Sequence, residues 1–256
     1  MTKAYVAVAL GLMLLKVCTW AVLLRPHVSL LLNSLYCTAT AFMFWSYAQA
    51  LRHWPPTRAE ERPPRTRPPR PLDLPEPFTR YCERCDADKA ADVHHCSVCH
   101  RCVYRMDHHC PWTGTCVAWR NKKVFLLFLL YTSLSCWAFN LMASRAIRAA
   151  VATTTSAAWL LKCGWILTLS IGSLLAGYFV FHLWLLREGK TTLEFLTGKP
   201  GELVDCSFKH NVTVYFGRAM WEWWIPTTPI LDAAIAGRER DEADERETLA
   251  QLVVTE

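Results

Sequence analysis

Long apolar runs constrain this sequence more than any other feature. From Ala4 to Leu24 the chain has 21 residues whose only charge is Lys16. An α-helix of that length extends about 31 Å at about 1.5 Å per residue, which matches the hydrocarbon thickness of a bilayer. A cleaved signal peptide is the alternative, but a second apolar run begins at once and no small-residue cleavage pattern precedes it. The run therefore predicts a first membrane-spanning helix.

Three further apolar runs predict three further spans. They extend from Val28 to Leu51, from Val124 to Ser144 and from about Leu160 to Leu186. Arg25-Pro26-His27 is the polar break between the first two runs, and the proline predicts a tight hairpin there. Because 52% of the residues are hydrophobic and they gather in unbroken runs, the chain is typical of a membrane protein rather than a soluble domain.

The distribution of charge predicts the orientation of these spans. If residues 52–123 and 187–256 share one side with the N-terminus, that side carries all 22 Asp and Glu residues. Only four basic residues then lie in the opposite loops: Arg25, Arg145, Arg148 and Lys162. Lys and Arg concentrate in cytosolic loops, so both termini are expected in the cytosol. Lys16 lies within the first span and has three interpretations: a functional site, a snorkelling side chain or a shifted helix register.

A stretch rich in Pro and Arg follows the second span. Residues 52–80 have no hydrophobic period and cannot form a packed core, so they predict an extended cytosolic linker. Arg65, Pro68 and Pro71 have the spacing of a ligand for SH3-like domains, although a basic spacer beside anionic lipid headgroups is the simpler interpretation. No nucleic-acid partner is expected.

Residues 81–121 hold seven of the twelve cysteines and five of the nine histidines. In the reducing cytosol, such a density favours metal binding or catalysis over disulfides. The stretch has too little apolar mass to fold unaided, so bound metal is expected to stabilise it. Eight residues are suitable ligands for two tetrahedral zinc sites: Cys82, Cys85, His95, Cys96, Cys99, Cys102, His109 and Cys116.

Cys110 is left over when eight ligands are assigned. His108 and Asp107 precede it, and they are the residue types that act as base and as orienting carboxylate for a thiol nucleophile. A neighbouring His and the field of a bound metal would both lower the pKa of the thiol. The alternative is that Cys110 is a ninth ligand in a purely structural region. Spacing alone leaves both interpretations open.

These residues resemble the DHHC-type (zinc-finger) protein S-acyltransferase family, the palmitoyltransferases, which move fatty acyl groups from acyl-coenzyme A to protein cysteines. The resemblance rests on His94-His95-Cys96-Ser97-x-Cys99, Met106-Asp107-His108-His109-Cys110-Pro111-Trp112 and Cys116-Val117. It extends to Thr191-Thr192-Leu193-Glu194 after the fourth span and to a segment from Asn211 to Gly217. It also covers the placement of a cysteine-rich domain between the second and third spans.

The resemblance implies a role for each of these residues. It assigns Cys82, Cys85, His95 and Cys102 to one zinc ion, and Cys96, Cys99, His109 and Cys116 to the other. Cys110 is then the nucleophile that accepts the acyl group, His108 its base and Asp107 the partner of that base. Thr191, Thr192, Glu194 and Asn211 form supporting motifs.

The fold class we expect is an all-α polytopic membrane protein, with four transmembrane helices and a small cytosolic two-zinc domain between helices 2 and 3. Its parts are the first two helices (4–51), the linker (52–80), the cysteine-rich domain (81–121), the last two helices (122–186) and a cytosolic C-terminal region (187–256).

Contacts with acyl-coenzyme A are expected at the cytosolic face and between the helices. Trp112, Arg120, Lys122 and Lys123 are candidates, although basic residues there also serve as a positive-inside collar. Ser135 lies on a face of small residues in the third span, which either packs closely against another helix or lines a cavity for the acyl chain.

The sequence thus predicts a protein S-palmitoyltransferase of endomembranes (Golgi or endoplasmic reticulum) or of the plasma membrane. It would transfer a long-chain acyl group to cysteines of proteins at the cytosolic membrane face through a thioester on Cys110. Two alternatives are a membrane-anchored zinc-binding module of ubiquitin-ligase type and a weakly active divergent member. The second follows from departures such as Gly114-Thr115, where the family usually has an Asn pair.

Overall fold

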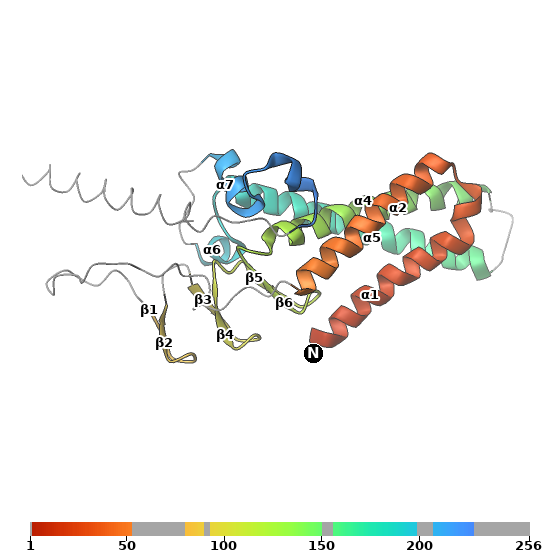
Figure 1. Ribbon diagram of the computed structural model, residues 1–256. Helices are drawn as coiled ribbons and strands as arrows, with labels where there is room; N and C mark the ends of the chain where they lie inside the picture. The colour runs from red at the N-terminus through yellow and green to blue at the C-terminus, as the bar shows by residue number, and fades with distance from the viewer. Residues whose placement is uncertain (1, 53–79, 90–92, 150–155, 199–206, 228–256) are drawn as a thin grey trace, which may run out of the picture.

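The computed structural model describes residues 2–52, 80–89, 93–149, 156–198 and 207–227. Four long helices occupy the four apolar runs of the sequence, and a group of short hairpins lies at one end of them (Figure 1). The region 53–79, with the SH3-type spacing Arg65, Pro68 and Pro71, lies outside the described residues, as does 228–256.

The first two helices form the predicted hairpin. Helix α1 (Thr2–Thr19) continues through a π-helical turn (Trp20–Leu24) and a 3-10 turn (Arg25–His27) before α2 (Leu30–Arg52) begins. The side-chain amide of Asn33 donates to the carbonyl oxygens of Arg25 and Val28, and its own oxygen accepts from the indole of Trp20. This side chain therefore satisfies backbone groups that the turn leaves open.

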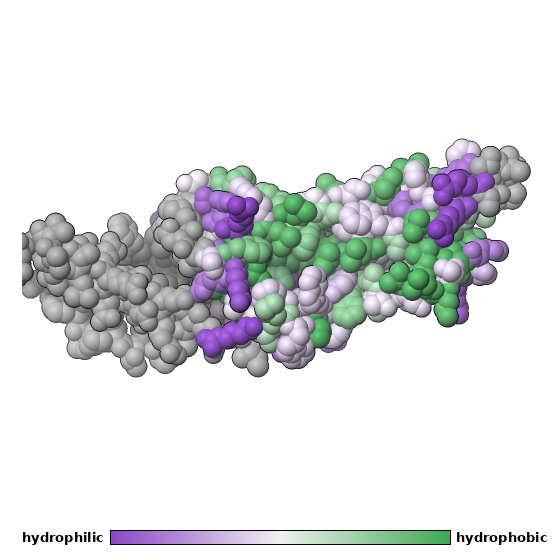
Figure 2. All heavy atoms as spheres, turned by 90° about the horizontal axis from the view of Figure 1, so that it is seen from above, coloured by the Kyte–Doolittle hydropathy of each residue, from purple (hydrophilic) through white to green (hydrophobic). Residues whose placement is uncertain are grey.

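Helix α4 (Lys122–Ala149) is the centre of the bundle. It packs against α2 on one side and against α5 (Ser156–Arg187) on the other. Two apolar clusters fill these contacts, one around Phe125, Leu126 and Leu129 and the other around Tyr36, Phe139 and Met142. Figure 2 shows apolar surface along the helices with hydrophilic residues at both ends, as a membrane-embedded bundle requires.

Among the described residues, three helices are long and apolar enough to cross a membrane: Lys3–His27, Lys122–Arg148 and Ser156–Arg187. Helix α2 is not one of them. It is 23 residues long, but Asn33, Ser34, Thr38, Thr40 and Ser46 lower its hydropathy. The structure thus agrees with a membrane protein that is mostly helical. Four spans were expected, and α2 is long enough to be the fourth, but it is not apolar enough.

The cysteine-rich region consists of three antiparallel two-stranded hairpins rather than helices. They are β1–β2 (Arg80–Cys82 and Ala87–Lys89), β3–β4 (Val93–Cys96 and Arg101–Tyr104) and β5–β6 (His108–Cys110 and Thr115–Val117). The prediction of an all-α fold was wrong for this region. Strands this short, with Cys and His at their ends, lack the alternating apolar pattern from which a strand is predicted.

Left-handed residues shape the turns of these hairpins. Asp86 (φ 47°) and His100 (φ 53°) follow the Cys-x2-Cys turns of β1–β2 and β3–β4, and Gly114 (φ 66°) lies in the turn of β5–β6. Glycine and asparagine both tolerate this conformation. Gly114 therefore keeps the turn geometry at the position where the sequence departs from the usual Asn pair.

The C-terminal segments cover the same end of the bundle. Helix α6 (Thr192–Thr197) begins at a capping box between Thr191 and Glu194, and α7 (Phe208–Phe216) is capped by Ser207. Helix α7 packs against α4 and α5 and is followed by a 3-10 turn (Met220–Trp224). The hairpin β5–β6, α6 and α7 thus lie near the start of α4, and β1–β2 lies farther from the bundle (Figure 1).

Candidate functional site

The hairpins build two Cys/His clusters by a repeated rule. In each cluster, one hairpin supplies two cysteines from its Cys-x2-Cys turn, and the next hairpin supplies a His and a Cys that face each other across its strands. The register pairs His95 with Cys102 and His109 with Cys116. The clusters are therefore Cys82, Cys85, His95 and Cys102, and Cys96, Cys99, His109 and Cys116. This repeat explains why the two ligand sets interleave along the sequence.

The spacing of the ligand atoms fits tetrahedral metal sites. In the first cluster, Nδ1 of His95 lies 3.5 Å from Sγ of Cys82 and 3.2 Å from Sγ of Cys85. In the second, Nδ1 of His109 lies 3.3 Å from Sγ of Cys99 and 3.7 Å from Sγ of Cys116. Metal–sulfur and metal–nitrogen bonds of about 2.3 and about 2.0 Å give tetrahedral edges of about 3.5 Å. Each cluster could therefore hold one metal ion.

The strand β5 separates the two adjacent histidines. Successive side chains of a strand point to opposite faces, so His108 and Cys110 share one face while His109 turns to the other, where the second cluster lies. His108 interacts with Cys110 on this face and lowers the pKa of its thiol. One short strand thus presents a metal ligand on one side and a base–thiol pair on the other.

Asp107 is the buried centre of the site. Its Oδ2 accepts from Nδ1 of His108 at 2.8 Å and from Oγ1 of Thr192 at 2.7 Å. Its Oδ1 accepts from Nζ of Lys122 at 2.8 Å and from the backbone N–H of Thr192 at 3.1 Å. Burial alone would raise the pKa of this carboxyl, but Lys122 and His108 hold the pKa well below its usual value. Asp107 is therefore an anion that fixes the tautomer and orientation of His108.

The environment favours the charged forms of His108 and Cys110. Burial opposes a charge on His108, but the hydrogen bonds to Asp107 and Cys110 raise its pKa to about 9. Burial likewise opposes a thiolate at Cys110, but the hydrogen bonds from His108 and Thr113 lower the pKa of the thiol. The pair can therefore generate a thiolate, the nucleophilic form of cysteine, in a site where only 6% of Cys110 is exposed.

The basic candidates for coenzyme contacts differ in position. Lys122 is fully buried and paired with Asp107. It therefore neither belongs to an exposed set of basic residues at the membrane face nor is available to bind a ligand. Lys123 is also buried, with its Nζ 3.4 Å from Oγ1 of Thr227. Arg120 is exposed. Trp112 is half exposed, with its ring 5.4 Å from the ring of Tyr5 in an edge-on contact.

The residues of the C-terminal motifs contact the site and its neighbouring helices through hydrogen bonds and a helix cap. Thr192 begins α6 and gives Asp107 two hydrogen bonds, while Thr191 and Glu194 form the capping box that fixes this turn. The buried Asn211 of α7 donates to the carbonyl oxygen of Leu186 at 2.9 Å, near the end of α5. These contacts therefore join α6 to Asp107 and α7 to the end of α5.

Ser135 lies inside the bundle, where it meets the lysine of the first span. Nζ of Lys16 donates to Oγ of Ser135 at 2.7 Å, and Oγ1 of Thr40 lies 2.7 Å from the same atom. Met43 Sδ is 3.6 Å from the ammonium. Lys16 is therefore buried among polar partners from α2 and α4 instead of snorkelling to the interface.

Sequence reasoning missed His182 of α5. Its side chain is completely buried, and its Nδ1 lies 4.0 Å from Oδ2 of Asp107. The available signal was an ionisable residue inside an apolar run long enough to span a membrane.

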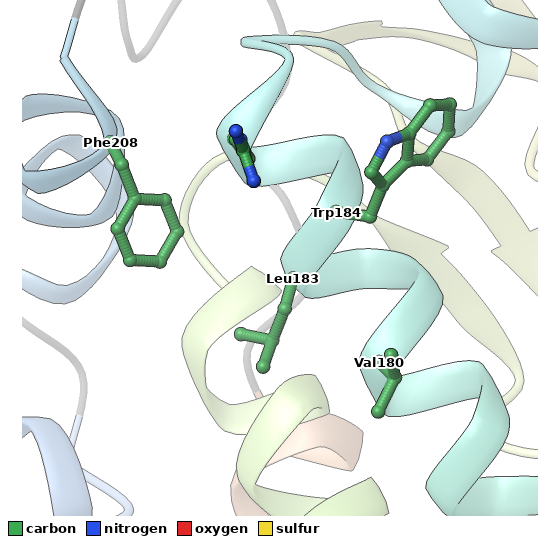
Figure 3. Close-up of a pocket in the computed structure, with 5 residues that line it drawn as sticks. Val180, Leu183, Trp184 and Phe208 are labelled. Atoms are coloured by element: carbon green, nitrogen blue, oxygen red, sulfur yellow. The ribbon is translucent and has the colours of Figure 1, made fainter.

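A shallow groove of about 460 Å³ lies on the outside of α5 and α7 (Figure 3). Val180, Leu183 and Trp184 line it from α5, and Phe208 lines it from α7. Arg187 is the charged residue of this lining. None of the residues that surround Asp107 takes part in it, so we treat it as separate from the site.

Comparison with known proteins matches residues 76–199 to the family model described as DHHC palmitoyltransferase. Palmitoyltransferase pfa3 of Emericella nidulans is 42% identical over 123 residues, which are 46% of this chain and 24% of that protein. Human palmitoyltransferase ZDHHC2 is 34% identical over 156 residues, or 57% of this chain and 42% of that protein. Human palmitoyltransferase ZDHHC15 is 34% identical over 160 residues, or 57% and 46%. The chain thus spans less than half the length of these relatives.

Proposed function

We propose that this chain is a protein S-acyltransferase of the DHHC palmitoyltransferase family, because residues 76–199 match the model of that family. The observation that carries the proposal is the arrangement of one strand face: His108 and Cys110 lie on the same face of β5, and Nδ1 of His108 is hydrogen-bonded to the buried Asp107. This is the geometry of an activated thiol nucleophile with an oriented base.

The reaction consists of two thioester exchanges. His108 takes the proton of Cys110, and the thiolate attacks the carbonyl carbon of acyl-coenzyme A. The bond from that carbon to the coenzyme sulfur breaks, and the coenzyme thiolate receives the proton from His108. A substrate cysteine then gives its proton to His108 and attacks the acyl-enzyme, and Cys110 recovers its thiol. Because one thioester replaces another, orientation contributes more to the rate than bond energy does.

Asp107 and its partners keep the charge of the site balanced during these steps. The carboxylate stabilises His108 when it becomes an imidazolium, and Lys122 compensates the carboxylate while His108 is neutral. Thr192 holds both carboxylate oxygens in place from α6. Two bound Zn²⁺ ions, which three thiolates and one imidazole per cluster favour, would hold the hairpins in the fold that places Cys110.

The membrane arrangement follows from the same proposal. Helices α1, α4 and α5 cross the bilayer, and α2, about 35 Å long at about 1.5 Å per residue, is the fourth span. Both termini and the hairpins face the cytosol of an endomembrane or of the plasma membrane, where proteins with exposed cysteines are the substrates. The coenzyme lies on the cytosolic side near Arg120, and the acyl chain extends between the helices toward Ser135.

An acylation assay tests the proposal. Purified full-length chain is incubated with labelled palmitoyl-coenzyme A, and a hydroxylamine-sensitive label is expected on the wild type but not on Cys110→Ser, with zinc content at two ions in both. A label that does not depend on Cys110 contradicts the enzyme function. Bound zinc without any label favours an interaction module of ubiquitin-ligase type.

The depth of the acyl site has its own test. Ser135→Phe fills space beside Lys16 and Thr40, so the preference should shift toward shorter acyl-coenzyme A in a competition assay. An unchanged preference would show that the acyl chain does not reach Ser135.

A further inference from the structure

The site contains a second imidazole that the proposed reaction does not use. His182 is completely buried on α5, and both of its ring nitrogens lack a hydrogen-bond partner within the part of the chain that the structure describes. A buried polar group without a partner is costly, and such groups in folded proteins usually have a functional reason.

Aromatic rings hold this imidazole in one orientation. Its centroid lies 4.6 Å from that of Tyr178 and 5.4 Å from that of Phe125, both in edge-on contacts. The ring of His108 is 5.9 Å away. In this position Nδ1 of His182 is 4.0 Å from Oδ2 of Asp107, about 1 Å beyond a normal hydrogen bond.

Oδ2 of Asp107 is the carboxylate oxygen that His108 contacts. It accepts from His108 and from Thr192, whereas Oδ1 is held by Lys122 and the Thr192 backbone. His108 exchanges protons with Cys110 and then with a second thiol, and a turn of its ring between them would lengthen its hydrogen bond to Oδ2. A donor that replaces it would keep the carboxylate in place.

Ligation of a metal ion is a weaker use of the same atoms. Asp107, His108 and His182 bring ligand atoms within 4.8 Å of one another. However, the ammonium of Lys122 lies 2.8 Å from the carboxylate and repels a second cation. His182 is therefore better suited to act as a neutral imidazole that donates a hydrogen bond from its N–H.

We propose, on the basis of the acyltransferase function proposed above, that His182 is a positioning residue. Its Nδ1–H moves about 1 Å and donates to Oδ2 of Asp107 when His108 turns between Cys110 and the second thiol. The carboxylate then stays oriented through both half-reactions, and His108 returns to the same tautomer.

Three substitutions separate this role from simple packing. In His182→Asn the amide nitrogen lies near the place of Nδ1, in His182→Gln it lies near the place of Nε2, and His182→Phe keeps the aromatic ring without any nitrogen. We expect the single-turnover rate of Cys110 acylation to fall about tenfold in the Phe and Gln variants and to be largely kept in the Asn variant. The KM for palmitoyl-coenzyme A should be unchanged in all three.

Zinc content and thermal stability of each variant show whether the fold is intact. Phe181→Leu is the matched control, because Phe181 contacts the same ring at 5.7 Å and has no polar atom; its rate should equal the wild-type rate. A wild-type rate in His182→Phe contradicts the role of His182, and so do equal losses in the Asn and Phe variants. If the wild type takes no Cys110-dependent label, the acyltransferase function itself fails, and the role of His182 fails with it.

Discussion

The two Cys/His clusters have the same ligand chemistry but different neighbours. The first, built on Cys82 and Cys85, packs in a small apolar group with Val93 and with Tyr104, whose ring also contacts Trp119 of the larger core. The second, built on Cys96 and Cys99, shares the hairpin β5–β6 with Cys110, and the chain runs from that hairpin directly into α4. The comparison teaches that two clusters with equal ligands can differ in their place in the fold: the second lies on the hairpin that carries Cys110, and the first lies on the hairpin that supplies the second with its turn.

The largest effect is expected when the second cluster loses a ligand. Cys99→Ala should release a metal held by this cluster, unfold β5–β6 and abolish acylation, because that metal would join the hairpin to β3–β4. Zinc content and hydroxylamine-sensitive label are the measurements. Ser97→Ala is the control, since Ser97 is an exposed residue of the same turn and no ligand. Full activity in Cys99→Ala would remove the basis for the comparison.

The second-largest effect is expected at Lys122, the first residue of α4 after the hairpin β5–β6. Lys122→Met leaves the buried Asp107 without its cationic partner, so the carboxylate would take up a proton or turn away from His108. We expect the acylation rate to fall about a hundredfold at unchanged zinc content. Lys122→Arg keeps the charge and should lose less. Equal losses in Met and Arg would indicate that shape, and not charge, matters at this position.

A smaller effect is expected in the first cluster. Cys85→Ala should release one metal ion and loosen β1–β2 while the second cluster and Cys110 keep their geometry, so activity should fall about tenfold instead of disappearing. The assay is the same, with the exposed Arg84→Ala as control. Loss of both metal ions in this variant would mean that the clusters fold as one cooperative unit.

The smallest effect is expected at Asn121, in the short loop that connects β6 to α4. The side chain of Asn121 accepts from the Ala118 backbone N–H at 2.8 Å and donates to the carbonyl oxygen of Cys116 at 2.9 Å. Asn121→Ala should cost about 2 kcal/mol of stability and lower the melting temperature by a few degrees, with only a modest loss of rate. Asn121→Asp retains the acceptor and should recover part of the stability. An unchanged melting temperature would show that the loop between β6 and α4 does not depend on this side chain.

Much of the site was predictable because metal ligands are encoded locally. The Cys-x2-Cys pairs and the spare cysteine indicated two metal sites and one thiol, and the clusters form from the predicted residues. The hairpins that carry them were not predicted, since metal binding replaces the apolar alternation that normally marks strands. The apolar runs predicted four spans, but three helices of the described residues are both long and apolar enough, because α2 mixes polar residues into a long helix.

What the sequence by itself determined is the chemistry: the soft ligands, the thiol with its neighbouring His and Asp, and the apolar runs of bilayer length. What only the tertiary structure decided is the surroundings of Asp107, where Thr192 arrives from 85 residues away and Lys122 turns inward from the first turn of α4. Likewise, Lys16 meets Ser135 across 119 residues. The physical reason is that spacing along the chain fixes which atoms can share a metal, whereas the rotation and packing of helices decide which side chain of an apolar run faces the site.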